Sequence, residues 1–121
     1  MTLEQLFVKC LYVAYKKNMN CFIQSFHLTD NDGLANDNIY KAKYDNSIWS
    51  ELTDSEVREL IDEDPSAGYD ALYKYISDDI MGFNFFINDM ILCTKSEIGV
   101  QNHEFNEVNI RTFLKEFEGS L

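Results

Sequence analysis

A helical repeat gives way to a strand pattern between residues 2 and 28, which read TLEQLFVKCLYVAYKKNMNCFIQSFHL. Up to residue 17 apolar residues recur at i, i+3, i+4 and i+7, and Thr2 and Gln5 have the spacing of a capping box. Phe, Ile and Cys then cluster between Met19 and Leu28, which is typical of a strand. We therefore expect a helix over residues 3–17, covered on more than one side, and a strand over residues 19–28.

The same two periodicities predict the elements that follow. A second strand over residues 38–44 is expected to pair with the first in antiparallel fashion. Thr53 and Glu56 form another capping box, Pro65 suits the first turn of a helix, and Gly82 suits the end of one. Helices are accordingly expected over residues 54–63, 66–80 and 106–118.

Residues 83–94 fit two patterns, because Phe and Ile alternate with Asn but also recur at helical spacing. We favour two strands joined by a turn at Asn88-Asp89, with a helix as the alternative, and we expect residues 95–104 to be loop. No linker or internal repeat divides the chain. The prediction is a single small α+β domain over residues 1–121, with about four helices on a small, mainly antiparallel sheet.

The composition excludes several classes of protein. The chain has 121 residues, 14% aromatic residues and a formal charge of −11 from 10 basic and 21 acidic residues, so it is neither a disordered chain nor a generic basic nucleic-acid binder. No apolar run is long enough to span a membrane. Three cysteines without paired spacing indicate a reducing compartment, and polar residues interrupt the N-terminal apolar positions, so we expect a cytoplasmic protein.

Motifs for catalysis and cofactor binding are missing from the sequence. It contains no GxGxxG, P-loop, HExxH or CxxC motif, and its Cys and His residues lack the close pairs of a zinc site. The acidic turn Asp30–Gly33 fails as an EF-hand loop, because the ligand positions would fall on Leu28 and Ile39. Cys21 and His27 lie too far apart on the expected strand to form a Cys–His pair, whereas folding could bring Cys93 and His103 together. We therefore expect no cofactor, no metal site and no catalytic residue.

Acidic residues are concentrated between residues 51 and 79, where ten acids and two bases give a net charge of −8. If the two helices of this segment pack side by side, their outward carboxylates form one anionic surface whose spacing resembles a row of phosphates. Exposed aromatic residues nearby, with Trp49, Tyr69 and Tyr75 as candidates, would anchor a protein interface. The predicted partner-binding residues are Glu51, Asp54, Glu56, Glu59, Asp62, Glu63, Asp64, Asp70, Asp78 and Asp79.

In size, charge and lack of catalytic motifs the chain is similar to two groups of inhibitors, although no motif carries the likeness. These are the acidic immunity proteins that neutralise nuclease toxins, and the small phage proteins of the anti-CRISPR and anti-restriction types. We therefore expect a non-enzymatic inhibitor of a basic protein, a nuclease or other nucleic-acid enzyme, without direct contact to nucleic acid or membrane. The alternatives are a scaffold domain, possibly homodimeric, whose charge serves solubility, and a small enzyme with a site assembled at long range.

Overall fold

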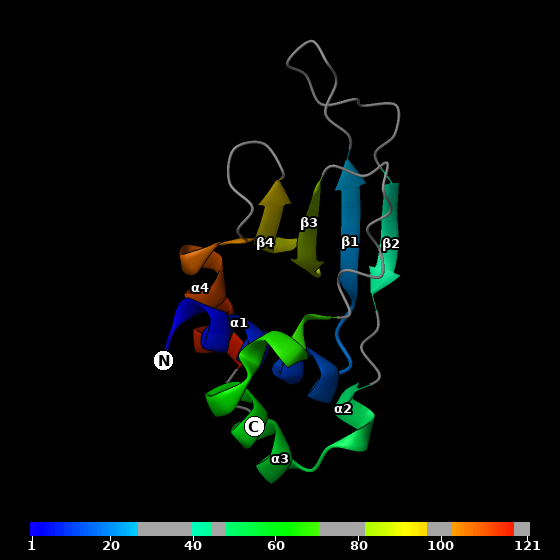
Figure 1. Ribbon diagram of the computed structural model, residues 1–121. Helices are drawn as coiled ribbons and strands as arrows, with labels where there is room; N and C mark the ends of the chain where they lie inside the picture. Colours follow the sequence, from blue (N-terminus) through cyan, green and yellow to red (C-terminus); the bar gives the residue numbers. More distant parts are fainter. Residues whose placement is uncertain (27–39, 45–47, 71–81, 97–102, 118–121) are drawn as a thin grey trace.

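A computed structural model describes residues 1–26, 40–44, 48–70, 82–96 and 103–117. Five strands of these ranges form one antiparallel sheet in the order β2-β1-β3-β4-β5 (Figure 1). The sheet lies at one end of the molecule and the helices lie at the other. The predicted α+β class is confirmed, with helices packed against an antiparallel sheet.

The first two strands form the pair that the sequence predicts. β1 (Cys21–Phe26) runs antiparallel to β2 (Tyr40–Tyr44), with Cys21 opposite Tyr44 and Ser25 opposite Tyr40. The ends of the two predicted strands, and the acidic turn between them, lie outside the described residues. On its other side β1 pairs with β3, so β1 is an interior strand of the sheet.

A β-hairpin forms over residues 82–96, as the alternation of Phe and Ile with Asn predicts. β3 (Gly82–Ile87) and β4 (Met90–Ser96) flank a two-residue turn, in which Asn88 adopts a positive φ of 53°. Asn tolerates this left-handed conformation better than most residues do. The side chains of Phe83, Phe85 and Ile87 are buried, so one face of β3 belongs to the core.

One sequence prediction near the hairpin is wrong. Residues 95–104 are not all loop, because β4 continues to Ser96 and β5 (His103–Phe105) pairs with β4. Gly82, predicted to follow the end of a helix, is the first residue of β3. Residues 71–81, which contain most of the helix predicted over residues 66–80, lie outside the described ranges.

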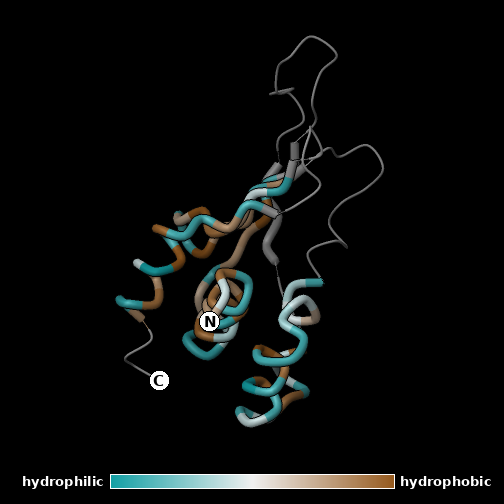
Figure 2. Tube along the Cα trace, turned by 60° about the vertical axis from the view of Figure 1, so that its left-hand side comes forward, coloured by the Kyte–Doolittle hydropathy of each residue, from teal (hydrophilic) through white to brown (hydrophobic). Residues whose placement is uncertain are grey.

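α1 (Leu3–Lys16) is the central helix of the core. Its N-terminus carries the predicted capping box, in which Thr2 and Gln5 exchange hydrogen bonds. α1 contacts α4 on one side and α3 and η2 on the other (Figure 2). The prediction that this helix is covered on more than one side is confirmed, since its buried side chains extend beyond one stripe and comprise Phe7, Val8, Cys10, Leu11, Val13 and Ala14.

The remaining helices pack around α1. α2 (Ile48–Glu51) is a single turn, α3 (Asp54–Glu63) begins at a capping box of Thr53 and Glu56, and α4 (Glu107–Phe117) buries its apolar stripe. Pro65 begins a new helical segment, as predicted. This segment, η2 (Pro65–Gly68), is however a 3-10 turn and not the first turn of an α-helix. No helix in the described ranges is both long and apolar enough to cross a membrane.

Candidate binding surface on α3

The carboxylates of α3 divide between two sides of the helix. With 3.6 residues per turn, Glu56, Glu59 and Glu63 fall on one stripe that points away from the buried residues Val57 and Ile61. All three carboxylate side chains belong to exposed residues. Within the described residues none of the three forms an ion pair with Lys or Arg.

This stripe borders an open depression between α3 and η2. The depression has a volume of about 290 Å³. Its lining combines three half-buried apolar residues with four exposed acidic ones, and comprises Leu52, Leu60, Ala67, Glu56, Glu59, Glu63 and Asp64. Asp64 is held in place because the Ser66 hydroxyl donates to its carboxylate at 2.9 Å. We call these four carboxylates and three apolar side chains the acidic depression.

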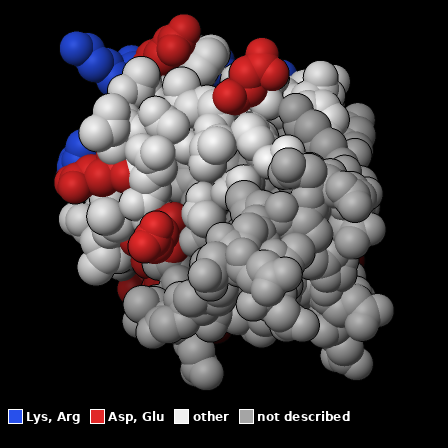
Figure 3. Space-filling view, turned by 90° about the horizontal axis from the view of Figure 1, so that it is seen from above, with Lys and Arg blue, Asp and Glu red and all other residues white. Residues whose placement is uncertain are grey.

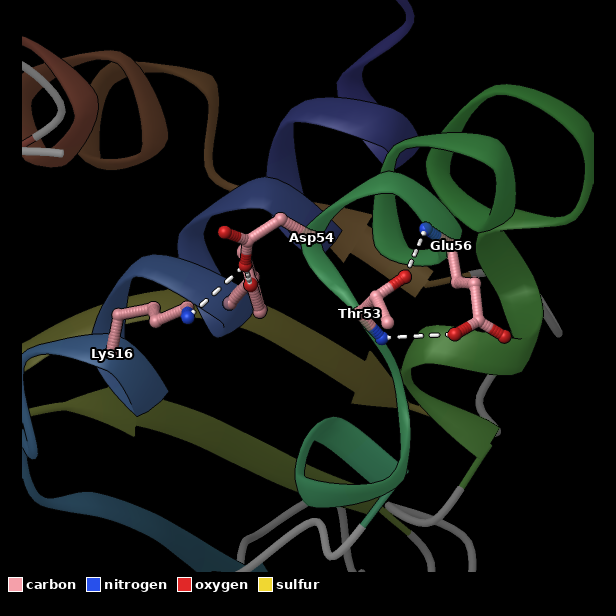
Figure 4. Close-up of polar contacts among 5 residues, drawn as sticks. Lys16, Thr53, Asp54 and Glu56 are labelled. Atoms are coloured by element: carbon pink, nitrogen blue, oxygen red, sulfur yellow. Dashed lines mark hydrogen bonds and ion pairs between the residues drawn. The ribbon is translucent and has the colours of Figure 1, made fainter.

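Asp54 is turned to another side of α3 and does not join the acidic depression. Its carboxylate accepts a hydrogen bond from the Tyr12 hydroxyl and pairs with Lys16 Nζ at 3.0 Å. The Tyr12 hydroxyl, followed by the Lys16 ammonium, holds the pKa of Asp54 below its usual range. In Figure 4 Asp54 faces Lys16 on α1, whereas Glu56 reaches back to Thr53. Asp54 is therefore exposed, but it is paired with Lys16 and lies on a different side of α3 from Glu56, Glu59 and Glu63.

The other predicted binding residues are dispersed. Glu51 on α2, Asp62 on α3 and Asp70 after η2 are exposed, but none of them lines the acidic depression. Asp78 and Asp79 lie outside the described residues. Within the described residues, the structure thus brings together four of the ten predicted carboxylates. On the face of the molecule seen in Figure 3, acidic side chains lie in separate places, and some of them adjoin Lys or Arg side chains.

Two of the three aromatic residues predicted as exposed anchors are instead buried. Trp49 is 3% exposed and lies against Tyr12, with ring centroids 5.5 Å apart. Tyr69 is 5% exposed, contacts the Phe7 ring edge-on at 5.8 Å and donates a hydrogen bond to Glu4 Oε2 at 2.5 Å. Both side chains fill the space between α1 and the segments that follow β2. Tyr75 lies outside the described residues.

The cysteines belong to the core. Cys10, Cys21 and Cys93 are buried, and burial raises the pKa of the Cys93 thiol to about 12. A thiol with this pKa carries almost no thiolate near neutral pH, so it is a poor nucleophile. Cys93 pairs across the strands with Phe105, while His103 pairs with Lys95. Among the residues that the structure describes, no group of three or more His, Cys, Asp or Glu side chains is placed to hold a metal ion.

Comparison with family models, curated proteins and solved structures finds no match to this chain.

Proposed function

We propose that this protein is a non-enzymatic inhibitor that binds a basic protein surface, that of a nuclease or other nucleic-acid enzyme, through the acidic depression. One observation carries the proposal: four acidic and three half-buried apolar residues line the same depression, and none of the four carboxylates is neutralised by a described Lys or Arg. A Lys or Arg side chain of the partner has matching chemistry. Its aliphatic stem would cover Leu52, Leu60 and Ala67, while its cationic end would reach the carboxylates.

Charge also affects the rate at which such a partner associates with the chain. A chain with a net charge of −11 attracts a basic protein over a distance of about 10 Å at ordinary ionic strength. The carboxylates of the acidic depression would then form ion pairs with the partner's cationic side chains, which otherwise bind the phosphates of the nucleic acid. Binding at this position excludes the nucleic acid because both ligands compete for the same cations.

The test is inhibition of a panel of purified basic nucleases at low salt. We expect the chain to inhibit at least one of them, and the double variant Glu59→Lys, Glu63→Lys to inhibit about tenfold less strongly or worse. Glu56 is left unchanged because it also caps α3.

The matched control is the double variant Glu104→Lys, Glu116→Lys, which makes the same change in net charge at exposed positions on β5 and α4. It should inhibit almost as well as the unchanged chain. Equal loss of inhibition in both double variants would show that net charge acts without the acidic depression. Binding of a partner that survives reversal of Glu59 and Glu63 would favour the scaffold alternative.

A further inference from the structure

A second hollow lies between α1 and α3 and has the opposite charge. Its volume is about 470 Å³, within the range of small-molecule sites. The lining contains three cations, one carboxylate, one phenol and two aliphatic side chains, namely Lys9, Lys16, Arg58, Asp54, Tyr12, Val57 and Ile61. Three of the ten basic residues of an acidic chain therefore gather around one cavity. We call it the cationic pocket.

Helical spacing brings these residues together. Lys9, Tyr12 and Lys16 recur at i, i+3 and i+7 and so share one face of α1. Asp54 and Arg58 are four residues apart on α3 and share a face there. The two faces meet because α1 contacts α3.

The polar groups of the cationic pocket are partly ordered by one another. Tyr12 and Lys16 both bond to the Asp54 carboxylate, and Lys16 Nζ lies 5.4 Å from the centre of the Tyr12 ring. Arg58 forms no ion pair with any described residue. The amides of Thr53 and Glu56 at the start of α3 are engaged in the capping box. Side chains, and not these two amides, would therefore bind a ligand in this pocket.

We propose that the cationic pocket binds a phosphate monoester whose organic part is apolar. Three cations and one carboxylate give the lining a formal charge of +2, which balances the roughly two negative charges of a phosphate monoester near neutral pH. The planar guanidinium of Arg58 matches two phosphate oxygens at once. Val57 and Ile61 also line the pocket, so the small exposed parts of their side chains, 1% and 5%, would meet the organic part.

The test uses phenyl phosphate as the probe, titrated into the full chain by calorimetry. We expect saturable binding in the millimolar range or tighter, with one site per chain. Arg58→Gln should weaken this binding about tenfold, because a charge-assisted bidentate contact is lost. Arg111→Gln on α4 makes the same change in charge away from the pocket and should leave the affinity almost unchanged.

Asp54→Asn gives a test of opposite sign. It removes the one carboxylate of the cationic pocket, so phenyl phosphate should bind about threefold to fivefold more tightly. No binding of phenyl phosphate, equal losses in the two Arg variants, or unchanged affinity in Asp54→Asn would overturn the site. Benzoate binding as tightly as phenyl phosphate would overturn the assignment to phosphate. Nuclease inhibition through Glu59 and Glu63 does not require this pocket, so the two proposals stand or fail separately.

Discussion

Gly68 lies where η2 comes closest to α1. A Cβ atom at this position would lie 2.5 Å from Val8 Cγ1, and 3.3 Å from side-chain atoms of both Leu60 and Trp49. Val8 is fully buried and β-branched, so its methyl group cannot turn away without a new clash. The absence of a side chain at residue 68 is therefore a condition for the contact between η2 and α1.

Gly68→Ala should lower the free energy of unfolding by about 1–3 kcal/mol, because the added methyl group overpacks the core. Urea unfolding followed by circular dichroism measures this change. Ser55→Ala on the exposed surface of α3 is the control and should change stability by less than about 0.5 kcal/mol. A Gly68→Ala variant as stable as the unchanged chain would contradict the close approach.

Asp54 makes stability depend on pH. Because its pKa is lowered in the folded chain, its contribution is present above the unfolded pKa and is lost as pH falls through the folded value. The melting temperature of the unchanged chain should therefore fall relative to that of Asp54→Asn between about pH 5 and pH 2. Melting curves of both chains across this range test the sign. A constant difference between them would show that the bonds to Tyr12 and Lys16 do not form in solution.

At the scale of the elements, the two capping boxes define where α1 and α3 begin. Thr53 accepts a hydrogen bond from the Glu56 amide, and Glu56 accepts one from the Thr53 amide. These bonds satisfy donors that the helix itself leaves without partners. Burial of Val57 and Ile61 then sets the rotation of α3, which directs Glu59 and Glu63 outward and Asp54 toward α1.

Thr53→Ala should lower the free energy of unfolding by about 1 kcal/mol, because one amide of the first turn loses its acceptor. Chemical denaturation measures the loss. Thr112→Ala is the control, since Thr112 is exposed within α4 and Ala is the better helix former there. It should leave stability unchanged or raise it by up to about 0.5 kcal/mol. Equal effects of the two substitutions would rule out a role for the cap.

At the scale of the whole molecule, acidic residues outnumber basic ones by 21 to 10, and self-repulsion opposes the compact state. Added NaCl should therefore raise the melting temperature, because ions screen this repulsion. The variant Glu59→Lys, Glu63→Lys loses two negative charges and gains two positive ones, so its net charge is −7 in place of −11 and it should show a smaller rise. A melting temperature that falls with salt would indicate that attractive pairs, such as Lys16 with Asp54, outweigh the repulsion.

The described elements with strong local signals were predictable from the sequence. The starts of α1 and α3 are each marked by a Thr, Thr2 or Thr53, that lies three residues before its partner in the capping box. Asn88-Asp89 separates two short apolar runs. These signals involve neighbours in the chain, so no knowledge of the fold is needed to interpret them. β5 was not predicted, because its three residues are too few to show an alternating pattern and it forms only by pairing with β4.

Local sequence patterns were enough to predict most of the described helices and strands, both capping boxes, the buried cysteines and the concentration of acids between residues 51 and 79. Which acids lie near one another depended on long-range packing, because the contact between α1 and α3 pairs Asp54 with Lys16 and leaves Glu59 and Glu63 at the acidic depression. Packing against α1 also buries Trp49 and Tyr69, and the contact between α1 and α3 creates the cationic pocket. Composition records how many charges a chain carries, whereas their neighbours depend on how helices distant in sequence pack together.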